Sequence, residues 1–122
     1  MAGGATIAWA QTHGGTRAQA RRLVQAILIE RLAACANMHP VESVFWWKGK
    51  KVEAKEFALV FKTAPDGLAR LIKRLRLLHP YEVPYLAWGR NESVLPEYAA
   101  WVSAQTTRHR QPRPRRRARR GT

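Results

Sequence analysis

Three side chains in this 122-residue sequence have types and spacing that suit metal binding. The single cysteine, Cys35, could offer a thiolate, which is a soft ligand suited to copper(I). In the stretch LHPYEVP (78–84), His79 offers an imidazole and Glu82 a carboxylate, and Pro80 between them restricts their relative placement. Because a metal site needs converging ligands, the sequence indicates Cys35, His79 and Glu82 as candidate metal ligands.

Each of these residues also has a structural interpretation. Cys35 falls on an apolar helical stripe, where a buried cysteine behaves as a small hydrophobic residue. His79 closes a helix, and a protonated imidazole is favourable at the negative helix end. The stretch 78–84 therefore predicts a rigid corner, with one wall of a ligand pocket as a further role. His13 and His39 are interpreted as solvated loop residues.

Lys62 and two tryptophans raise a separate question about ligands. Lys62 ends an apolar strand, where a charge is costly unless it finds a partner. Either Glu82 or a bound anion could be that partner. Trp46 and Trp47 could stack on a ligand, but tryptophans on paired strands more often belong to an interface core. No nucleophile–base–acid set, phosphate-binding loop or pair of catalytic carboxylates is visible, so we do not expect an enzyme.

The elements that must position these residues alternate in a recognisable order. Apolar alternation and three- to four-residue periodicity predict strands at residues 6–9, 41–47, 52–63 and 83–88, and helices at 16–35, 65–79 and from about 96. Thr16 can cap the first helix, and Pro80 forbids continuation of the second. The order βαββαβ with a short final helix is the ferredoxin-like α+β pattern, in which right-handed crossovers place both long helices on one face of the sheet.

The predicted strand 52–63 is apolar on both of its sides. Phe57, Leu59 and Phe61 alternate with Ala58 and Val60, whereas a half-wet antiparallel strand should alternate apolar and polar residues. There is no third long helix to cover the second face of the sheet. We therefore expect a second copy of the chain to cover it, and thus a homo-oligomer.

Four motifs together resemble one family, the CutA divalent-cation tolerance proteins. They are ERLAACANM (30–38), SVFWWKGK (43–50), the pair Lys62-Thr63, and LHPYEVP (78–84), and PEYAAWV (96–102) resembles the terminal helix of that family. The resemblance covers residues 5–104. It implies a ferredoxin-like homotrimer with hairpins that pair between subunits and sheets that face the centre. It also implies a non-enzymatic role in metal-ion tolerance, with copper or other divalent cations as ligands and Cys35 as a copper-associated residue.

The same resemblance suggests an alternative ligand. The family is similar in architecture to the PII signalling trimers, which implies a sensor of a small anionic metabolite in a cleft between subunits. The candidate residues of this inter-subunit cleft are Lys62, Tyr81, Glu82 and Trp47.

Charge divides the chain into a domain, 1–107, and a tail, 108–122. The tail contains eight arginines and no acidic residue, whereas the formal net charge of the whole chain is +14. Its composition predicts disorder. It could bind phosphates non-specifically, so a nucleic-acid-binding module is the rival function. We expect no membrane span or secretory signal, and the single cysteine suits the cytoplasm.

Overall fold

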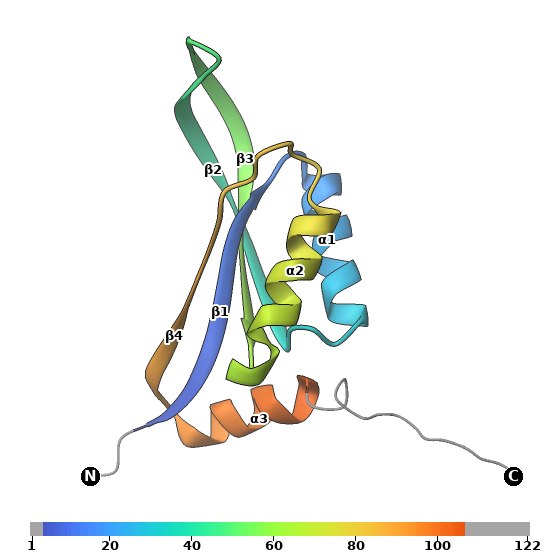
Figure 1. Cartoon of the computed structure of the whole chain (residues 1–122), viewed down its shortest axis with the longest axis vertical. Helices are drawn as coiled ribbons and strands as arrows, with labels where there is room; N and C mark the ends of the chain where they lie inside the picture. Colours follow the sequence, from blue (N-terminus) through green and yellow to red (C-terminus); the bar gives the residue numbers. More distant parts are fainter. Residues whose placement is uncertain (1–3, 107–122) are drawn as a thin grey trace, which may run out of the picture.

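The computed structural model describes residues 4–106, so the predicted tail at 108–122 lies outside the described residues. The elements are β1 (Ala5–Gly14), α1 (Arg17–Ile29), β2 (Cys35–Trp47), β3 (Lys50–Thr63), a 3-10 turn η1 (Pro65–Gly67), α2 (Leu68–Leu78), β4 (Leu86–Val94) and α3 (Pro96–Thr106) (Figure 1). The predicted ferredoxin-like order βαββαβ, with a C-terminal helix, is confirmed.

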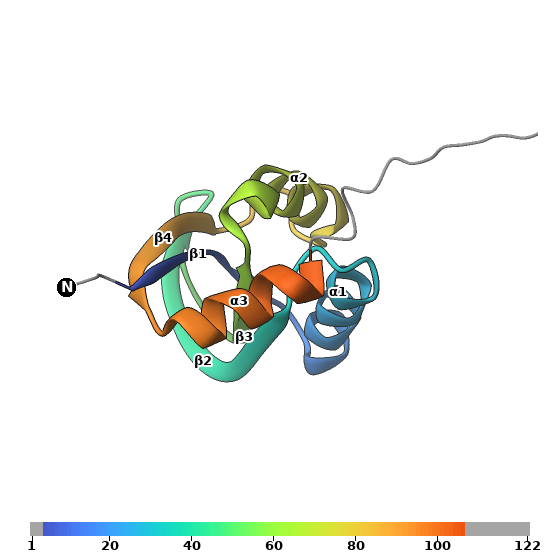
Figure 2. The ribbon, with the colours of Figure 1, turned by 90° about the horizontal axis from the view of Figure 1, so that it is seen from below.

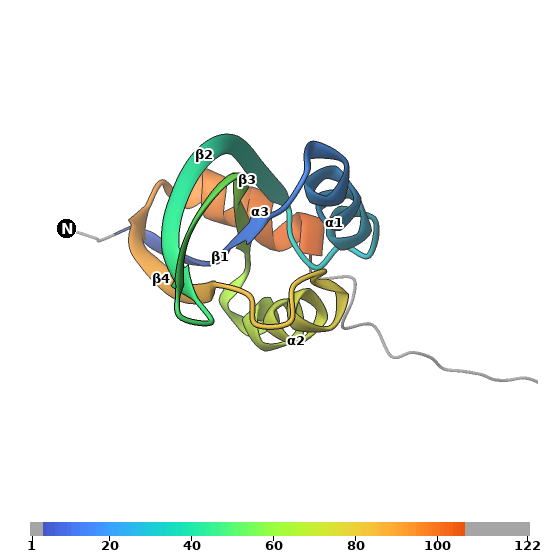
Figure 3. The ribbon, with the colours of Figure 1, turned by 90° about the horizontal axis from the view of Figure 1, so that it is seen from above.

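The four strands form one antiparallel sheet in the order β2-β3-β1-β4. Helices α1 and α2 lie side by side on one face of this sheet (Figures 1 and 3). Helix α3 crosses one end of the molecule, as the view from below shows (Figure 2), and packs Ala99 and Val102 against Ile7 of β1. The opposite sheet face has no long helix among the described residues, as predicted.

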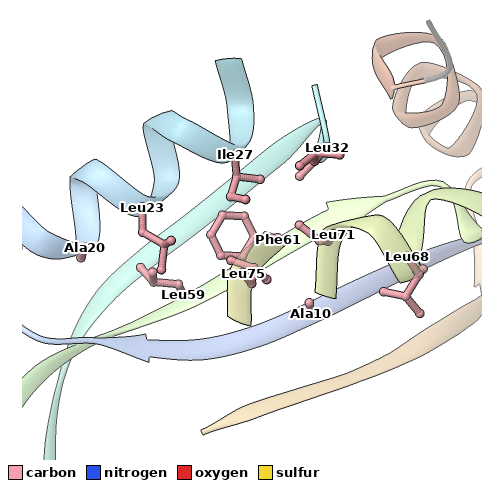
Figure 4. Close-up of a cluster of buried hydrophobic side chains, with 12 residues drawn as sticks. Ala10, Ala20, Leu23, Ile27, Leu32, Leu59, Phe61, Leu68, Leu71 and Leu75 are labelled. Carbon is pink, nitrogen blue, oxygen red and sulfur yellow. The ribbon is translucent and has the colours of Figure 1, made fainter. Parts of the chain in front are cut away.

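The main core fills the space between the sheet and helices α1 and α2 (Figure 4). Leu23 and Ile27 of α1, with Leu71 and Leu75 of α2, surround Phe61 of β3. Phe61 is 0% exposed. The predicted helical stripes therefore point toward one shared centre, which is why both helices pack on the same side.

Helix α1 begins as predicted but ends earlier. The hydroxyl of Thr16 accepts from the Gln19 N–H at 3.1 Å, and the Gln19 side chain accepts from the Thr16 N–H at 2.9 Å. The helix stops at Ile29 because Arg31, with φ 57°, turns the chain out of the helical path. The backbone N–H of Leu32 then bonds to the carbonyl of Ile27, which is a Schellman closure without the usual glycine.

This early stop corrects three predictions about the following segment. Cys35 is not on the helix but opens β2, so this strand begins before its predicted start at residue 41. His39 therefore lies in a strand, not a loop, and His13 likewise belongs to β1. Pro40 is tolerated because β2 is an edge strand, where a missing N–H can face away from the sheet.

Two other strands also differ from their predicted bounds. β1 continues past Trp9 to Gly14, and β4 begins at Leu86 instead of Val83. The hydroxyl of Thr12 donates to the carbonyl of Tyr85, which is the residue just before β4 starts. The Tyr85 carbonyl therefore bonds to a side chain.

The β2–β3 hairpin is the most extended part of the molecule and projects beyond the helices (Figure 1). Its two strands are joined by the two-residue turn Lys48-Gly49, whose φ angles of 52° and 79° are those of a type I′ turn. Phe45, Trp46 and Trp47 near this turn are 40%, 73% and 42% exposed. The hairpin therefore carries its aromatic side chains in the open.

The sheet face opposite α1 and α2 is more polar than predicted. Directly paired residues share a face, and the register places Gln11 and Asn37 on either side of Val60. In the same way, His13 and His39 flank Ala58. The exposed large apolar side chains on this side of the molecule are thus concentrated in the hairpin and not in the middle of the sheet.

Candidate ligand-binding cleft

A cleft of about 700 Å³ lies between the outer half of the hairpin and the loop 79–85, which connects α2 to β4. Most of its wall is aromatic or aliphatic, and its polar groups come from two glutamates, one histidine, one serine and the hydroxyls of two tyrosines. The lining residues are His13, Ser43, Val44, Phe45, Trp47, Val52, Glu56, Tyr81, Glu82, Val83 and Tyr85. None of these is a lysine or an arginine.

Glu56 of β3 is the buried acidic group of this cleft, at 7% exposure. The hydroxyl of Tyr81 donates to Glu56 Oε1 at 2.7 Å, and Nδ1 of His13 lies 3.8 Å from Oε2. Burial, followed by the hydrogen bond and negative charge of Glu56, raises the pKa of Tyr81 to about 12. Tyr81 therefore keeps its proton at neutral pH and anchors the loop to the hairpin.

His79 ties the same loop to β1. Its Nδ1 lies 3.1 Å from the backbone nitrogen of Tyr81 and accepts a hydrogen bond from that N–H, so the ring hydrogen is on Nε2. Nε2 then donates to the carbonyl of His13 at 2.7 Å. Burial, the largest effect, lowers the pKa of His79, although the carbonyl of His13 and the charge of Glu56 oppose this. Both ring nitrogens are engaged, so the predicted rigid corner is present.

The structure brings some of the predicted cleft residues together and separates others. Trp47, Tyr81 and Glu82 line the cleft, but Lys62 does not. Lys62 pairs with Trp9 and Cys35 across the sheet, and its Nζ is 5.9 Å from the centre of the Tyr98 ring.

The predicted partner of Lys62 is also absent within one chain. Among residues 4–106, His13 pairs with Glu56 and Arg74 with Glu30, and Lys62 forms no ion pair with Glu82. The ring of Tyr98 instead lies over the lysine charge, which favours a cation–π contact.

The three candidate metal ligands do not converge within one chain. Cys35 is beside Lys62 at the sheet edge, with Sγ 4.0 Å from Asn37 Oδ1, whereas His79 and Glu82 belong to the cleft loop. Across the described part of the chain, no group of three or more His, Cys, Asp or Glu side chains could hold a metal ion. A closed metal site from Cys35, His79 and Glu82 does not fit a single copy.

The residues that sequence reasoning missed are Glu56, His13 and Tyr85. Glu56 lies between Ala54 and Ala58 on the face of β3 opposite the helices, and this isolated acid at an otherwise small apolar position was the available signal. His13 was assigned to a loop because Gly14 follows it, yet β1 extends through both residues.

Among residues 4–106, no helix has the length and apolar character needed to cross a membrane.

The sequence and the fold of this chain both match proteins of one family. Residues 9–105 match the CutA1 divalent ion tolerance protein family. The divalent-cation tolerance protein CutA of Thermotoga maritima is 40% identical over 84 residues, which are 69% of this chain and 83% of that protein.

Solved structures agree with the sequence match. The structure of the periplasmic divalent cation tolerance protein CutA from Archaeoglobus fulgidus superposes with a TM-score of 0.77 at 29% identity, covering 82% of this chain and 98% of the other. The PII-like protein CutA from Nostoc sp. PCC 7120 gives a TM-score of 0.77 at 31% identity, with 81% and 96% covered. By sequence and by fold, the chain belongs to the CutA1 divalent ion tolerance protein family.

Proposed function

We propose that the chain acts in divalent-ion tolerance as a homotrimer that binds divalent cations, with copper as the first ion to test. The observation that carries the proposal is the charge of the cleft. Its lining includes the carboxylates of Glu56 and Glu82 and the imidazole of His13, and no basic residue other than that histidine. Oxygen and imidazole ligands of this kind suit divalent cations, and the field of the carboxylates favours positive ligands.

Glu82 is the carboxylate best placed to meet an incoming ion. Glu56 is already held by Tyr81, whereas Glu82 is exposed on the loop that forms one wall of the cleft. Cys35 and His79 remain candidate ligands, but His79 would have to give up one of its two hydrogen bonds. A site with three ligands therefore needs a side chain from a second copy.

The homotrimer is supported by the exposed hairpin. Trp46 is 73% exposed at the end of an arm that reaches beyond the helices, and Phe45 and Trp47 are beside it. Burying aromatic side chains of this size against another copy would contribute about 1.5–3 kcal/mol each. The proposed assembly has sheets facing the centre and hairpins pairing between copies. This would bring Lys62 of one copy toward the cleft of another.

We propose no catalytic role, and we propose the cytoplasm as the compartment. The family description names tolerance to ions and not a reaction, which supports the first statement. The lone cysteine supports the second, although the Archaeoglobus fulgidus relative is described as periplasmic.

Calorimetry with copper(II) and zinc(II), with copper(I) as a separate arm under reducing conditions, tests the proposal. It compares the wild type with Glu82→Gln, Cys35→Ser and His79→Ala, while light scattering gives the mass of the assembly. We expect a trimer at micromolar concentration and at least tenfold weaker binding in Glu82→Gln. Unchanged binding in all three variants would remove the three ligands predicted from the sequence. A monomeric wild type would contradict the assembly.

A second candidate is a PII-like sensor of a small anionic metabolite, bound at Lys62, Tyr81, Glu82 and Trp47. The volume of the cleft suits a small molecule, and the Nostoc relative is described as PII-like. This candidate needs Lys62 of another copy to neutralise the anion. Titration of ATP and ADP separates the two functions, because nucleotide binding lost in Lys62→Gln, without any metal, would favour the sensor.

A further inference from the structure

The positive charge of the folded domain is concentrated on helices α1 and α2. Together these two helices contain seven basic residues and none of the eight acidic residues of the chain. The seven are Arg17, Arg21, Arg22, Arg70, Lys73, Arg74 and Arg76. All of them are exposed except Arg74, which is partly buried. We call these seven residues the basic helix layer.

The acidic residues next to this layer leave most of its charge uncompensated. Arg74 donates to both carboxylate oxygens of Glu30, at 2.9 Å and 2.8 Å, and so joins the end of α1 to α2. Asp66 precedes α2 in the turn η1. Two carboxylates therefore stand against seven cations of the two helices, and Arg31 beyond α1 adds another positive charge.

The layer lies on one side of the molecule because α1 and α2 lie side by side on the same face of the sheet (Figures 1 and 3). The apolar stripes of both helices point into the core, at Leu23 and Ile27 in α1 and at Leu71 and Leu75 in α2. The charged residues fall at the other helical positions and so face outward. The projecting hairpin with its exposed aromatics is a separate surface.

Six of the seven cations are arginines, whose planar guanidinium groups bind phosphate oxygens in pairs. The layer contains no aromatic residue, although proteins that bind single strands stack bases on aromatic side chains. Insertion into a membrane interface also needs a broad apolar face, but the large exposed apolar residues on α1 and α2 are only Ile29 and Leu77. These features together favour a duplex.

We propose that the basic helix layer binds double-stranded nucleic acid through its phosphates, without reading the base sequence. The eight arginines at 108–122 add charge of the same sign to the chain, and they lie outside the described residues. Binding of this type is strongly salt-dependent, because each neutralised phosphate releases condensed counterions. The site is distinct from the cleft, so metal binding and duplex binding can fail independently.

The test measures binding of a labelled 24-base-pair DNA duplex of arbitrary sequence to the full-length chain between 50 and 200 mM NaCl. The helix variant carries Arg22→Gln, Arg70→Gln and Lys73→Gln, which keep side-chain length and helix propensity. Its matched control removes three exposed lysines from the hairpin, by Lys50→Gln, Lys51→Gln and Lys55→Gln, and is compared at equal assembly mass by light scattering, because the hairpin is the proposed interface between copies. All three proteins keep residues 108–122, so the contribution of the tail is the same in each.

We expect the slope of log Kd against log [NaCl] to fall by about 2–3 in the helix variant, at about 0.9 per lost phosphate contact. The affinity at 0.1 M salt should fall at least tenfold. The hairpin control should keep the wild-type slope. If the helix variant is poorly folded by circular dichroism, the single substitutions Lys73→Gln and Lys55→Gln replace the triples, with an expected fall of about 1 for Lys73→Gln alone.

Three results would overturn the proposal. The first is a wild-type slope in the helix variant. The second is an equal loss in the hairpin control, which would mean that only net charge matters. The third is a helix variant that binds the duplex like the wild type but no longer binds phosphatidylserine vesicles. That result would make the partner an anionic lipid surface.

Discussion

The two sides of this molecule solve the problem of apolar surface in opposite ways. On the helix side, Phe61, Leu71 and Leu75 are each 0% exposed, and the outer surface is charged. On the hairpin side, Trp46 and Val44 are 73% and 62% exposed at the end of a two-stranded arm. One chain thus completes its core on the first side and leaves apolar surface uncovered on the second.

This difference separates stability from function within one small domain. The helix side should determine whether the chain folds, since removal of buried side chains leaves cavities. The hairpin side should determine what the folded chain binds, including other copies of itself, since its aromatics contribute little until something covers them. Substitutions on the two sides should therefore change different measurements.

The largest effect on folding is expected for Phe61→Ala. Phe61 fills the centre of the core, so its loss should lower the free energy of unfolding by about 3–5 kcal/mol. Urea denaturation monitored by circular dichroism measures this change. The control Ile29→Ala removes an 83% exposed side chain and should cost less than about 0.5 kcal/mol. Equal losses in the two variants would break the distinction between the sides.

The next effect concerns assembly. Trp46→Ala should weaken the proposed trimer by about 2 kcal/mol or more per interface, since exposed tryptophans of this kind are typical interface hot spots. Light scattering over a dilution series measures the change, and far-ultraviolet circular dichroism should stay the same. Leu77→Ala is the matched control, because Leu77 is 72% exposed but lies on α2. A trimer that resists dilution equally in both variants would show that the hairpin is not the interface.

A smaller loss is expected when the anchor of the cleft loop is removed. Tyr81→Phe leaves buried Glu56 without its 2.7 Å donor, which should cost about 1–3 kcal/mol. Tyr85→Phe is the control, since its hydroxyl is 3.5 Å from Gln11 Oε1. Because the pKa of Tyr81 is raised to about 12, its contribution to the free energy of unfolding should be lost as pH rises from about 10 through 12. Absorbance at 295 nm follows this titration.

The contribution of His79 should depend on pH in the opposite direction. Burial lowers the pKa of His79, so the unfolded chain binds its proton more readily than the folded chain. The stabilisation should be fully present above about pH 6.5 and decrease as pH falls through the lowered value. His79→Gln should flatten the difference in stability between pH 7 and pH 5. A steeper dependence in the variant would mean that His79 is charged in the folded protein.

The smallest effect is expected at the start of α1. Thr16→Ala removes the side-chain half of the capping box and should cost about 1 kcal/mol, measured by urea denaturation. It should leave assembly unchanged, because Thr16 lies on the helix side. A change in the mass of the assembly would contradict that separation.

The order of the elements and the main core were predictable because each depends on local patterns. The periodic leucines and isoleucines of α1 and α2, and the alternation around Phe61, are visible in the sequence and correspond to buried positions. The point where α1 ends was not predictable, because Arg31 takes the left-handed position usually filled by glycine. The early start of β2 was not predictable for a related reason, since only the sheet order shows that β2 is an edge strand and can include Pro40.

The site was harder to predict than the fold because its residues are distant in sequence. Tyr81 and Trp47 were expected near a pocket and do line one, although Lys62 was expected with them and faces Tyr98 instead. The contact between Tyr81 and Glu56 spans 25 residues and depends on where the loop folds back over the hairpin. No local pattern encodes that return, so Glu56 was overlooked.

The Lys48-Gly49 turn has a consequence for how copies meet. A type I′ turn matches the right-handed twist of its strands, and thirteen cross-strand pairs follow from Trp47↔Lys50 back to Cys35↔Lys62. The arm is thus built within its own chain and needs little further ordering on contact. Subunits that part should keep this shape and rejoin without refolding. Differently labelled populations should accordingly exchange protomers under conditions in which the domain remains native.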